Sequence, residues 1–265
     1  MSNIKLENLE INGYMIYQDK DSFNFGIDAV LLANFALRRY SSVNKTSNVS
    51  ICDFCTGTLP IPLIMYAKRK NFLGEKVNFS AFEIDKEQVD LCNKSILYNK
   101  ENVSDAKDID KDIRVYNDDI KNIINDKDKC KNLFESFDVV TVNPPYTKKG
   151  SGLVNENDKK VIARHEIFIT FDEICKATNL LLKPNKKFYI IHHSERFTEL
   201  CETLKKNSFE AKFVQFIHPS IDKKSNLCLI EAVKNANPGV TIMEPIIIYE
   251  NDGNYTKKVL EIYGK

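Results

Sequence analysis

The sequence predicts an α/β fold built on a doubly wound, mainly parallel sheet. Short apolar segments typical of strands alternate along the chain with segments of helical apolar spacing. Polar residues follow directly after four of the apolar segments, where parallel strands end at a common edge. The last two strand segments follow each other without a helix between them, so at least one strand should run antiparallel.

The N-terminal part is expected to precede the main sheet. Residues 1–25 have the pattern of short extended pieces with a turn at Asn12-Gly13. Residues 27–39 have helical spacing with basic residues at the end, as the helix dipole favours. A polar linker follows over 41–48, so we expect residues 1–45 to be an extension of a single domain formed by 46–265.

The alternation predicts seven strands in the main sheet. The stretch 104–112 is highly charged and is expected to be mobile, and residues 245–263 are expected to add one more strand and a short helix or strand. The predicted strands are 49–54, 77–84, 113–117, 137–142, 186–193, 211–219 and 226–233, and the predicted helices are 60–70, 86–99, 120–134, 163–181 and 194–206.

Composition narrows the class of protein. Hydrophobic residues make up 43% and charged residues 28% of 265 positions, which is ordinary globular usage. Lys plus Arg is 38 against 37 for Asp plus Glu, which excludes a strongly basic coat protein but leaves room for a local basic patch. Seven cysteines, no apolar core in residues 1–10 and no long apolar run predict a reduced cytoplasmic protein without a membrane span.

The first polar signal is "DFCTGTLPIPL" at 53–63. Asp53 ends a strand, and the turn around Gly57 leads into a helix, an arrangement over which a nucleotide-type cofactor can lie. An ordinary strand-to-helix turn is the alternative. Cys52 and Cys55 form a CxxC pair, but no second Cys or His pair has metal spacing, so we predict no metal and expect Cys52 to face the core.

Acidic residues follow the next two strands. Glu83 ends the second strand, where an acid can accept hydrogen bonds from both ribose hydroxyls of a nucleoside, while Asp85 fits a helix cap better. Asp118 and Asp119 follow the third strand, and either can accept from an adenine amino group or cap the next helix. Of these two we favour Asp119 for the base.

The fourth signal is Asn143-Pro144-Pro145-Tyr146, directly after a buried strand. Neither proline can donate a ladder hydrogen bond, so the strand ends there and the backbone is stiff. The Asn143 amide oxygen and the Pro144 carbonyl can accept both hydrogens of an exocyclic NH2 group, and Tyr146 can stack on its ring. A paired base would first swing out to reach such a pocket.

These motifs together resemble the class I S-adenosylmethionine-dependent methyltransferases that act on amines. The stretches "FNFGIDAVLLANFA" (23–36), "ARHE" (163–166) and the tail at 218–264 are similar to the bacterial tRNA1(Val) adenine-N6 methyltransferase family. The resemblance covers nearly the whole chain and implies the Rossmann-like, seven-stranded class I sheet with one antiparallel strand. It departs from the family in the cofactor loop, where Cys55 and Leu59 stand at places usually held by glycine.

The resemblance implies a monomeric enzyme that methylates N6 of the adenosine just 3′ of the anticodon of a valine tRNA. By position, S-adenosylmethionine would contact Phe25, Asp28, Asp53, Gly57, Glu83, Asp119 and Asn143, with the N-terminal extension packing on the cofactor site. Asn143, Pro144 and Tyr146 would hold the target base, and Lys148, Lys149, Arg164 and His165 would face the RNA. Because the sulfonium donor is already activated, catalysis is mainly positioning and needs no catalytic His or Cys.

Two other functions remain open at this point. The same chemistry fits another amine, a guanine N2 in rRNA or a glutamine side chain in a protein. The altered cofactor loop also fits an inactive RNA-binding relic of the fold.

Overall fold

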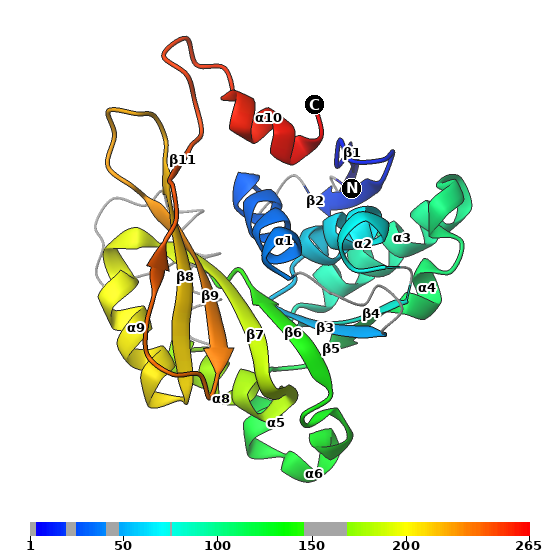
Figure 1. Cartoon of the computed structure of the whole chain (residues 1–265). Helices are drawn as coiled ribbons and strands as arrows, with labels where there is room; N and C mark the ends of the chain where they lie inside the picture. Colours follow the sequence, from blue (N-terminus) through cyan, green and yellow to red (C-terminus); the bar gives the residue numbers. More distant parts are fainter. Residues whose placement is uncertain (1–3, 20–24, 41–47, 75, 146–168) are drawn as a thin grey trace, which may run out of the picture.

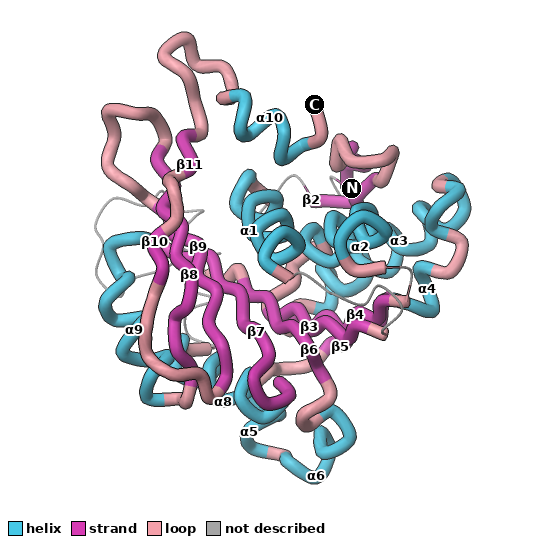
Figure 2. Tube along the Cα trace, in the orientation of Figure 1, coloured by secondary structure: helices cyan, strands magenta, loops and turns pink. Residues whose placement is uncertain are grey.

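The large sheet is the frame on which the strand-end residues are arranged (Figures 1 and 2). The structure is a computed structural model that describes residues 4–19, 25–40, 48–74, 76–145 and 169–265. Seven long strands lie in the order β5-β4-β3-β6-β7-β9-β8, and the short β10 and β11 pair with β8. These strands are β3 (Val49–Phe54), β4 (Val77–Glu83), β5 (Ile113–Asn117), β6 (Phe137–Val142), β7 (Leu182–His193), β8 (Phe209–His218), β9 (Leu227–Lys234), β10 (Thr241–Ile242) and β11 (Ile246–Ile247).

The predicted mixture of strand directions is confirmed. β3 pairs in parallel with β4 and β6, and β9 runs antiparallel to both of its neighbours, β7 and β8. The chain first adds β4 and β5 on one side of β3 and then returns to add β6 on the other side. The strand order therefore reverses between β3 and β6, which is where ligands bind in open α/β sheets.

Helices cover both faces of the sheet, as Figure 2 shows. One apolar cluster joins the sheet to the helices that follow β3 and β4 and to the first helix, and a second cluster joins its other face to the helices around β7. The first face carries α1 (Ile27–Arg39), α2 (Pro60–Phe72), α3 (Lys86–Asn102) and α4 (Ile109–Asp112), and the second carries α5 (Lys121–Asn125), α8 (Phe171–Leu181) and α9 (Phe197–Lys206).

A hairpin of β1 (Ile4–Asn8) and β2 (Met15–Asp19) packs beside α3 rather than joining the sheet. The predicted turn is present, with positive φ at Asn12 and Gly13. The buried side chains of Ser95 and Asn99 accept hydrogen bonds from the backbone of β2, at 2.9 Å from Tyr17 N and 2.8 Å from Met15 N. These side chains supply the hydrogen-bond acceptors that a neighbouring strand would otherwise give to the free edge of β2.

The charged stretch 104–112 is folded, so the expectation of mobility is wrong. Residues Ser104–Ala106 form a 3-10 turn (η1) and α4 follows, with Ala106 and Ile109 fully buried. Buried Arg69 on α2 donates to the backbone oxygen of Asp105 at 2.8 Å and to its carboxylate at 3.1 Å. The two apolar residues at i and i+3 dock the segment together with polar contacts at both of its ends, since Asp112 also accepts from Tyr66 OH at 2.7 Å. The charges between these contacts face outward.

Two predicted helices differ from the observed ones because polar side chains set their ends. The segment 120–134 divides into α5, α6 (Lys127–Cys130) and a 3-10 turn η2 (Lys131–Leu133), with Asp126 in a non-helical conformation between the first two. The helix α8 starts at Phe171, since Thr170 and Glu173 form a capping box. The predicted positions 163–168 lie outside the described residues.

The C-terminal tail is short strands and one helix, as expected. The helix α10 (Lys257–Tyr263) packs against α1 through the buried Val259 and Ile262. Thr256 caps it, accepting from Val259 N at 3.4 Å. The helix η3 (Ser194–Arg196) precedes α9, so the predicted helix 194–206 is present in two parts.

Candidate active site at the carboxyl ends of the strands

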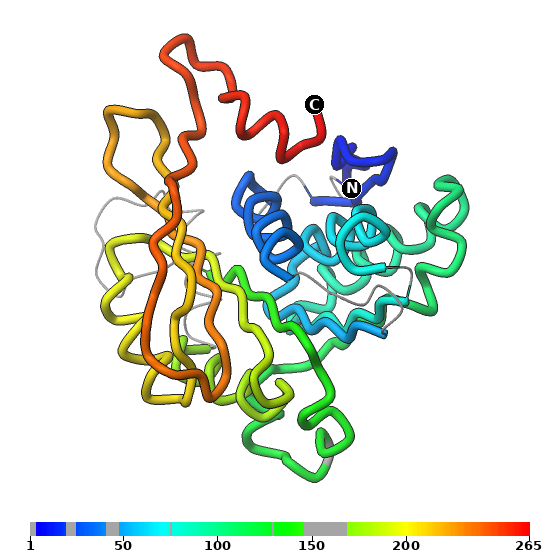
Figure 3. Tube along the Cα trace, viewed as in Figure 1, coloured from blue at the N-terminus to red at the C-terminus, as the bar shows by residue number. Residues whose placement is uncertain are grey.

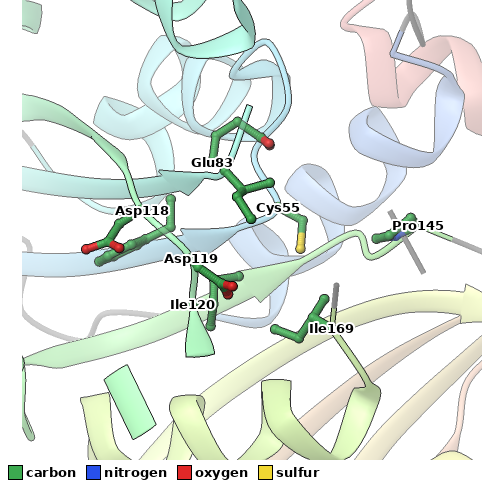
Figure 4. Close-up of a pocket in the computed structure, with 9 residues that line it drawn as sticks. Cys55, Glu83, Asp118, Asp119, Ile120, Pro145 and Ile169 are labelled. Atoms are coloured by element: carbon green, nitrogen blue, oxygen red, sulfur yellow. The ribbon is translucent and has the colours of Figure 1, made fainter. Parts of the chain in front are cut away.

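A pocket opens at the point where the strand order reverses (Figure 4). Its volume is about 410 Å³, including the open space at its mouth. Its walls come from the ends of β3, β4, β5 and β6 and from the start of the segment before α8. The lining residues are Cys55, Phe82, Glu83, Ile84, Asp118, Asp119, Ile120, Pro145 and Ile169.

The loop after β3 turns through three left-handed residues: Cys55 at φ +53°, Gly57 at +56° and Leu59 at +80°. Leu59 N donates to Thr56 O at 3.0 Å, which closes the turn before α2 begins. Left-handed backbone is favourable for glycine and costs other residues about 1–2 kcal/mol each. The loop therefore has a conformation suited to glycine, although two of the three positions carry side chains.

Cys55 projects into the pocket from this loop, as Figure 4 shows. Burial raises the pKa of its thiol well above the usual range, and the charges of Glu83, Asp53 and Asp119 raise it further. The thiol is therefore neutral. The partner in the CxxC pair, Cys52, is fully buried in the core as predicted.

Asp53 is buried behind the loop and is not among the residues that line the pocket. Its carboxylate accepts a hydrogen bond from Thr56 Oγ1 at 2.6 Å and another from Thr141 Oγ1 on β6. Burial raises the pKa of Asp53 to about 7, and the two hydroxyl hydrogen bonds oppose this shift. Its predicted contact with a cofactor stays a prediction, while its observed bonds tie the loop to β6.

Glu83 lines the pocket and also holds the loop. One carboxylate oxygen accepts from Gly57 N at 2.9 Å and the other from Asp85 N at 3.0 Å. Each oxygen of an ionised carboxylate has capacity for a second hydrogen bond. Glu83 can therefore accept ligand hydroxyls without releasing the loop.

Both acids after β5 lie in the pocket wall, although only one was favoured from the sequence. Asp119 accepts from Lys121 N at 2.9 Å, so it also holds the first N–H of α5, and Lys121 Nζ lies 3.5 Å from its other oxygen. Asp118 accepts from Asn122 Nδ2 at 2.6 Å. Each of these carboxylates can accept a hydrogen bond from α5 and another from a ligand in the pocket, because a carboxylate has several lone pairs. A role at the start of the helix and a role in ligand binding are therefore compatible.

The Asn143-Pro144-Pro145 segment leaves β6 beside the cofactor loop. Val142, the last residue of β6, pairs with Phe54, the last residue of β3, so the next residue of each strand leaves the sheet at the same edge. Pro144 is buried, Asn143 is half-buried, and Pro145 forms part of the pocket wall. The predicted Tyr146, Lys148, Lys149, Arg164 and His165 lie outside the described residues.

The two predicted N-terminal contacts do not line this pocket. Phe25 packs against the core of the first face, and its N–H donates to Gln18 Oε1 at 2.9 Å. Asp28, in the first turn of α1, has a pKa raised by burial, an effect that the charge of His193 at the end of β7 opposes. Both residues stay predicted contacts.

The lining fits a nucleoside-type ligand. Three carboxylates can accept from hydroxyl and amino groups, and apolar side chains between them can cover the faces of a flat base. The described residues contain no group of three or more His, Cys, Asp or Glu side chains arranged to hold a metal ion. No described helix is both long and apolar enough to cross a membrane.

The chain is similar in sequence to curated methyltransferases. The four curated proteins that match the chain share the name tRNA1(Val) (adenine(37)-N6)-methyltransferase. The protein of Dyadobacter fermentans is 30% identical over 118 residues, 44% of this chain and 48% of that protein. The protein of Phocaeicola vulgatus is 29% identical over 179 residues, 67% of this chain and 63% of that protein. The chain spans about half the length of the Dyadobacter relative and of the one from Shewanella sediminis.

Solved structures share the fold. A protein of Agrobacterium tumefaciens predicted to be an O-methyltransferase superposes with a TM-score of 0.66 at 18% identity, covering 89% of this chain and 95% of that one. A protein of Listeria monocytogenes assigned to the class I S-adenosylmethionine-dependent methyltransferases has a TM-score of 0.58 at 14% identity, covering 93% and 72%. The chain has the class I methyltransferase fold, and the predicted family resemblance is confirmed. No protein-family model matches the chain.

Within this class I methyltransferase fold, sequence reasoning missed the apolar part of the pocket. Ile84, which follows Glu83, is 41% exposed, and Ile120 and Ile169 lie in the same wall. Phe82 stacks on Tyr116 with ring centroids 4.8 Å apart and planes at 10°, which stiffens the floor. The signal available in the sequence was an isoleucine directly after Glu83 and directly after Asp119, where a loop residue is usually polar.

Proposed function

We propose that the protein transfers a methyl group from S-adenosylmethionine to N6 of the adenosine 3′ of the anticodon of a valine tRNA. The observation that carries this proposal is that Glu83, Asp119 and Pro145 line one pocket. A donor-binding acid and the segment proposed to hold the target base therefore share a single site. The names of the four curated relatives support the choice of reaction and substrate.

On the donor side, this chain's residues would bind and orient a nucleoside. Glu83 would accept from the ribose hydroxyls, Asp119 would accept from the adenine amino group, and Ile84 and Ile120 would cover the ring. When bound, S-adenosylmethionine supplies an electrophilic methyl group on a positively charged sulfur. Asp53 would act behind the loop, holding Thr56 and Thr141 together.

On the acceptor side, the proline segment would supply positioning rather than acid-base chemistry. The Asn143 amide oxygen and the Pro144 carbonyl would accept the two hydrogens of N6, and Tyr146 would stack on the base. Held this way, the nitrogen lone pair is directed away from the ring plane and towards the methyl group. Pro144 is buried, so the carbonyl that accepts has little freedom to move.

Several further properties form part of the proposal. The protein would act as a monomer in the cytoplasm, where tRNA is present. Residues 1–45 would pack over the cofactor site as an extension of the catalytic domain 46–265, with Phe25 and Asp28 contacting the donor. Lys148, Lys149, Arg164 and His165 would contact RNA near the pocket.

The loop geometry argues against an inactive relic. A side chain at Cys55 or Leu59 was the reason to suspect a distorted loop, yet both residues adopt the left-handed backbone that a glycine would have. The hydrogen bonds from Gly57 N to Glu83 and from Thr56 to Asp53 are also formed. A loop held in this conformation supports donor binding.

The test is tritium transfer from labelled S-adenosylmethionine to bulk tRNA, followed by digestion to nucleosides. We expect N6-methyladenosine from the wild type and at least a 100-fold slower transfer from Asn143→Ala, with donor affinity by calorimetry unchanged within a few-fold. Asn102→Ala, an exposed position on α3, is the matched control and should retain full transfer.

Each other outcome selects an alternative. A wild type that binds the donor but leaves no N6-methyladenosine in tRNA would replace the adenine-N6 assignment by another amine, a guanine N2 in rRNA or a glutamine side chain in a protein. Equal transfer by wild type and Asn143→Ala would contradict the role of the proline segment. No donor binding at millimolar concentration would support the inactive relic.

A further inference from the structure

Exposed apolar side chains are most frequent in the C-terminal part of the described chain. Six of the eight large hydrophobic residues that are exposed there lie between residues 221 and 260. Ile221 is the most exposed of them, at 67%. Of the remaining two, Ile84 belongs to the pocket already described. Two of the six, Ile221 and Tyr249, come from segments that the hydrogen bond from Tyr249 N to Pro219 O holds together, and exposed apolar side chains on adjoining segments mark an interaction surface.

Three tyrosines of the tail form a stack within this region. The rings of Tyr249 and Tyr255 are 5.4 Å apart with planes at 17°, and those of Tyr255 and Tyr263 are 5.8 Å apart with planes at 19°. Tyr249 stands at one end of the stack and is 41% exposed. An aromatic ring in that position offers an apolar surface on which another flat ring can stack.

The stack is held rigidly to the sheet. Ile248 N donates to His218 O and Tyr249 N to Pro219 O, both at 2.9 Å, so the tail continues along the end of β8. Glu250 N donates to Asn254 O at 2.8 Å and closes the hairpin that brings Tyr255 back. A surface fixed in this way needs little ordering when a partner binds.

Exposed lysines occur on the loop after β8 and in the tail that carries the tyrosines. Lys223 and Lys224 lie on the loop after β8, next to exposed Ile221, and Lys257 and Lys258 open the tail helix α10. Figures 1 and 3 show this loop and the tyrosine hairpin projecting together beyond the sheet. We name Ile221, Lys223, Lys224, Tyr249, Tyr255 and Lys257 the tail platform.

The tail platform does not carry a strong net positive charge. Asp222, Glu250, Asp252 and Glu261 are also exposed in this region and match the number of lysines. Asp252 is engaged, accepting from Asn254 N at 3.0 Å and from Asn254 Nδ2 at 2.9 Å. A nucleic acid would therefore be held here through stacking and a few lysine–phosphate contacts, with only a modest dependence on salt.

The tail platform lies at the same edge of the sheet as the pocket. β8 runs in the same direction as β6, because β9 is antiparallel to both β7 and β8, so both strands end at that edge. Three strand spacings separate β6 from β8, which is about 14 Å. This is less than the width of a double-stranded stem, so a stem whose loop enters the pocket from this edge would extend over the tail platform.

We propose that the tail platform is the surface that binds the RNA substrate outside the pocket. It rests on the proposed function, which makes the substrate an RNA stem-loop. A base or ribose stacks on Tyr249, Ile221 supports the same contact, and the lysines contact phosphates of the adjoining stem. The proposal assigns the family-like tail a role in substrate binding that is separate from donor binding and from methyl transfer.

The experiment measures tRNA affinity for three proteins. Tyr249→Ala should weaken the binding of bulk tRNA about tenfold, since stacking contributes about 1–3 kcal/mol per base. Lys223→Glu with Lys224→Glu should weaken binding and lower the slope of log affinity against log salt by about 1–2. The charge-matched control is Lys94→Glu with Lys107→Glu, two exposed positions on the α3 side of the protein, and should leave both quantities unchanged.

Two further measurements separate the outcomes. Donor affinity by calorimetry should be the same in all variants, because no tail-platform residue lines the pocket. Wild-type methyl transfer to tRNA together with unchanged tRNA affinity in both variants would overturn the tail platform and leave the proposed function standing. A wild type that neither binds nor methylates tRNA would overturn both. A dimer in light scattering that Tyr249→Ala dissociates would show that the surface binds a second copy instead.

Discussion

The left-handed loop residues give the sharpest test of how the cofactor loop is built. Cys55→Gly and Leu59→Gly each replace a side chain at positive φ by the residue that this backbone favours. The two positions differ in what the side chain contacts. Cys55 lines the pocket, whereas Leu59 is fully buried in the core of the first face.

The expected stability changes follow from that difference. Relief of the left-handed strain gains about 1–2 kcal/mol at either position, and the extra freedom of glycine in the unfolded chain costs about 0.5–1 kcal/mol. Cys55→Gly should therefore raise the free energy of unfolding by about 0–1.5 kcal/mol. Leu59→Gly also loses a buried side chain, worth about 2–5 kcal/mol, so its net loss should be about 0.5–5 kcal/mol.

Cys55→Gly should affect the binding of S-adenosylmethionine more than Leu59→Gly does, although it affects stability less. Removing the Cys55 side chain enlarges the pocket between Glu83 and Pro145, and we expect S-adenosylmethionine to bind about fivefold more tightly, roughly 1 kcal/mol. Urea denaturation measures the stabilities and calorimetry the dissociation constants, with Cys201→Ser on α9 as the thiol control. Weaker donor binding by Cys55→Gly would refute the reasoning, because it would mean that the thiol contacts the ligand favourably.

Three further predictions concern the groups around the loop and the folded charged stretch. Glu83→Gln should weaken donor binding at least tenfold, as measured by calorimetry. It should also destabilise the protein by about 1–2 kcal/mol in urea denaturation, because the N–H of either Gly57 or Asp85 loses its acceptor. The folded-state pKa of Asp53, about 7, lies above the unfolded value, so its contribution to stability is present below about pH 4 and is lost as the pH rises to about 7. The unfolding free energy of the wild type relative to Asp53→Asn should therefore fall by a few kcal/mol over that range, and a flat difference would contradict the buried carboxyl. Arg69→Met should destabilise the protein by about 2–4 kcal/mol and raise amide exchange over 104–112, whereas a mobile segment would show the same fast exchange in both proteins.

The position of each acid in the site could be predicted, but its orientation could not. The strand-to-loop boundaries at Asp53, Glu83 and Asp119 follow from local apolar patterns, and the structure has strands ending at 54, 83 and 117. Which of these side chains enters the pocket depends on the contacts that each one makes in the folded sheet. Asp53 turns away to two hydroxyl groups, while Asp118 and Asp119 both reach the pocket wall.

The sequence by itself determined the alternation of strands and helices, the antiparallel strand near the end and the edge at which polar residues gather. These features depend on residues close together in the chain, whose spacing alone decides which face is apolar. Only the tertiary structure decided that Ala106 and Ile109 dock the charged stretch, that Cys55 and Leu59 keep a left-handed loop, and that Tyr249 stands beside the loop after β8. Those outcomes depend on contacts between segments far apart in sequence, because such contacts repay the entropy of ordering the chain only once the sheet has brought the segments together.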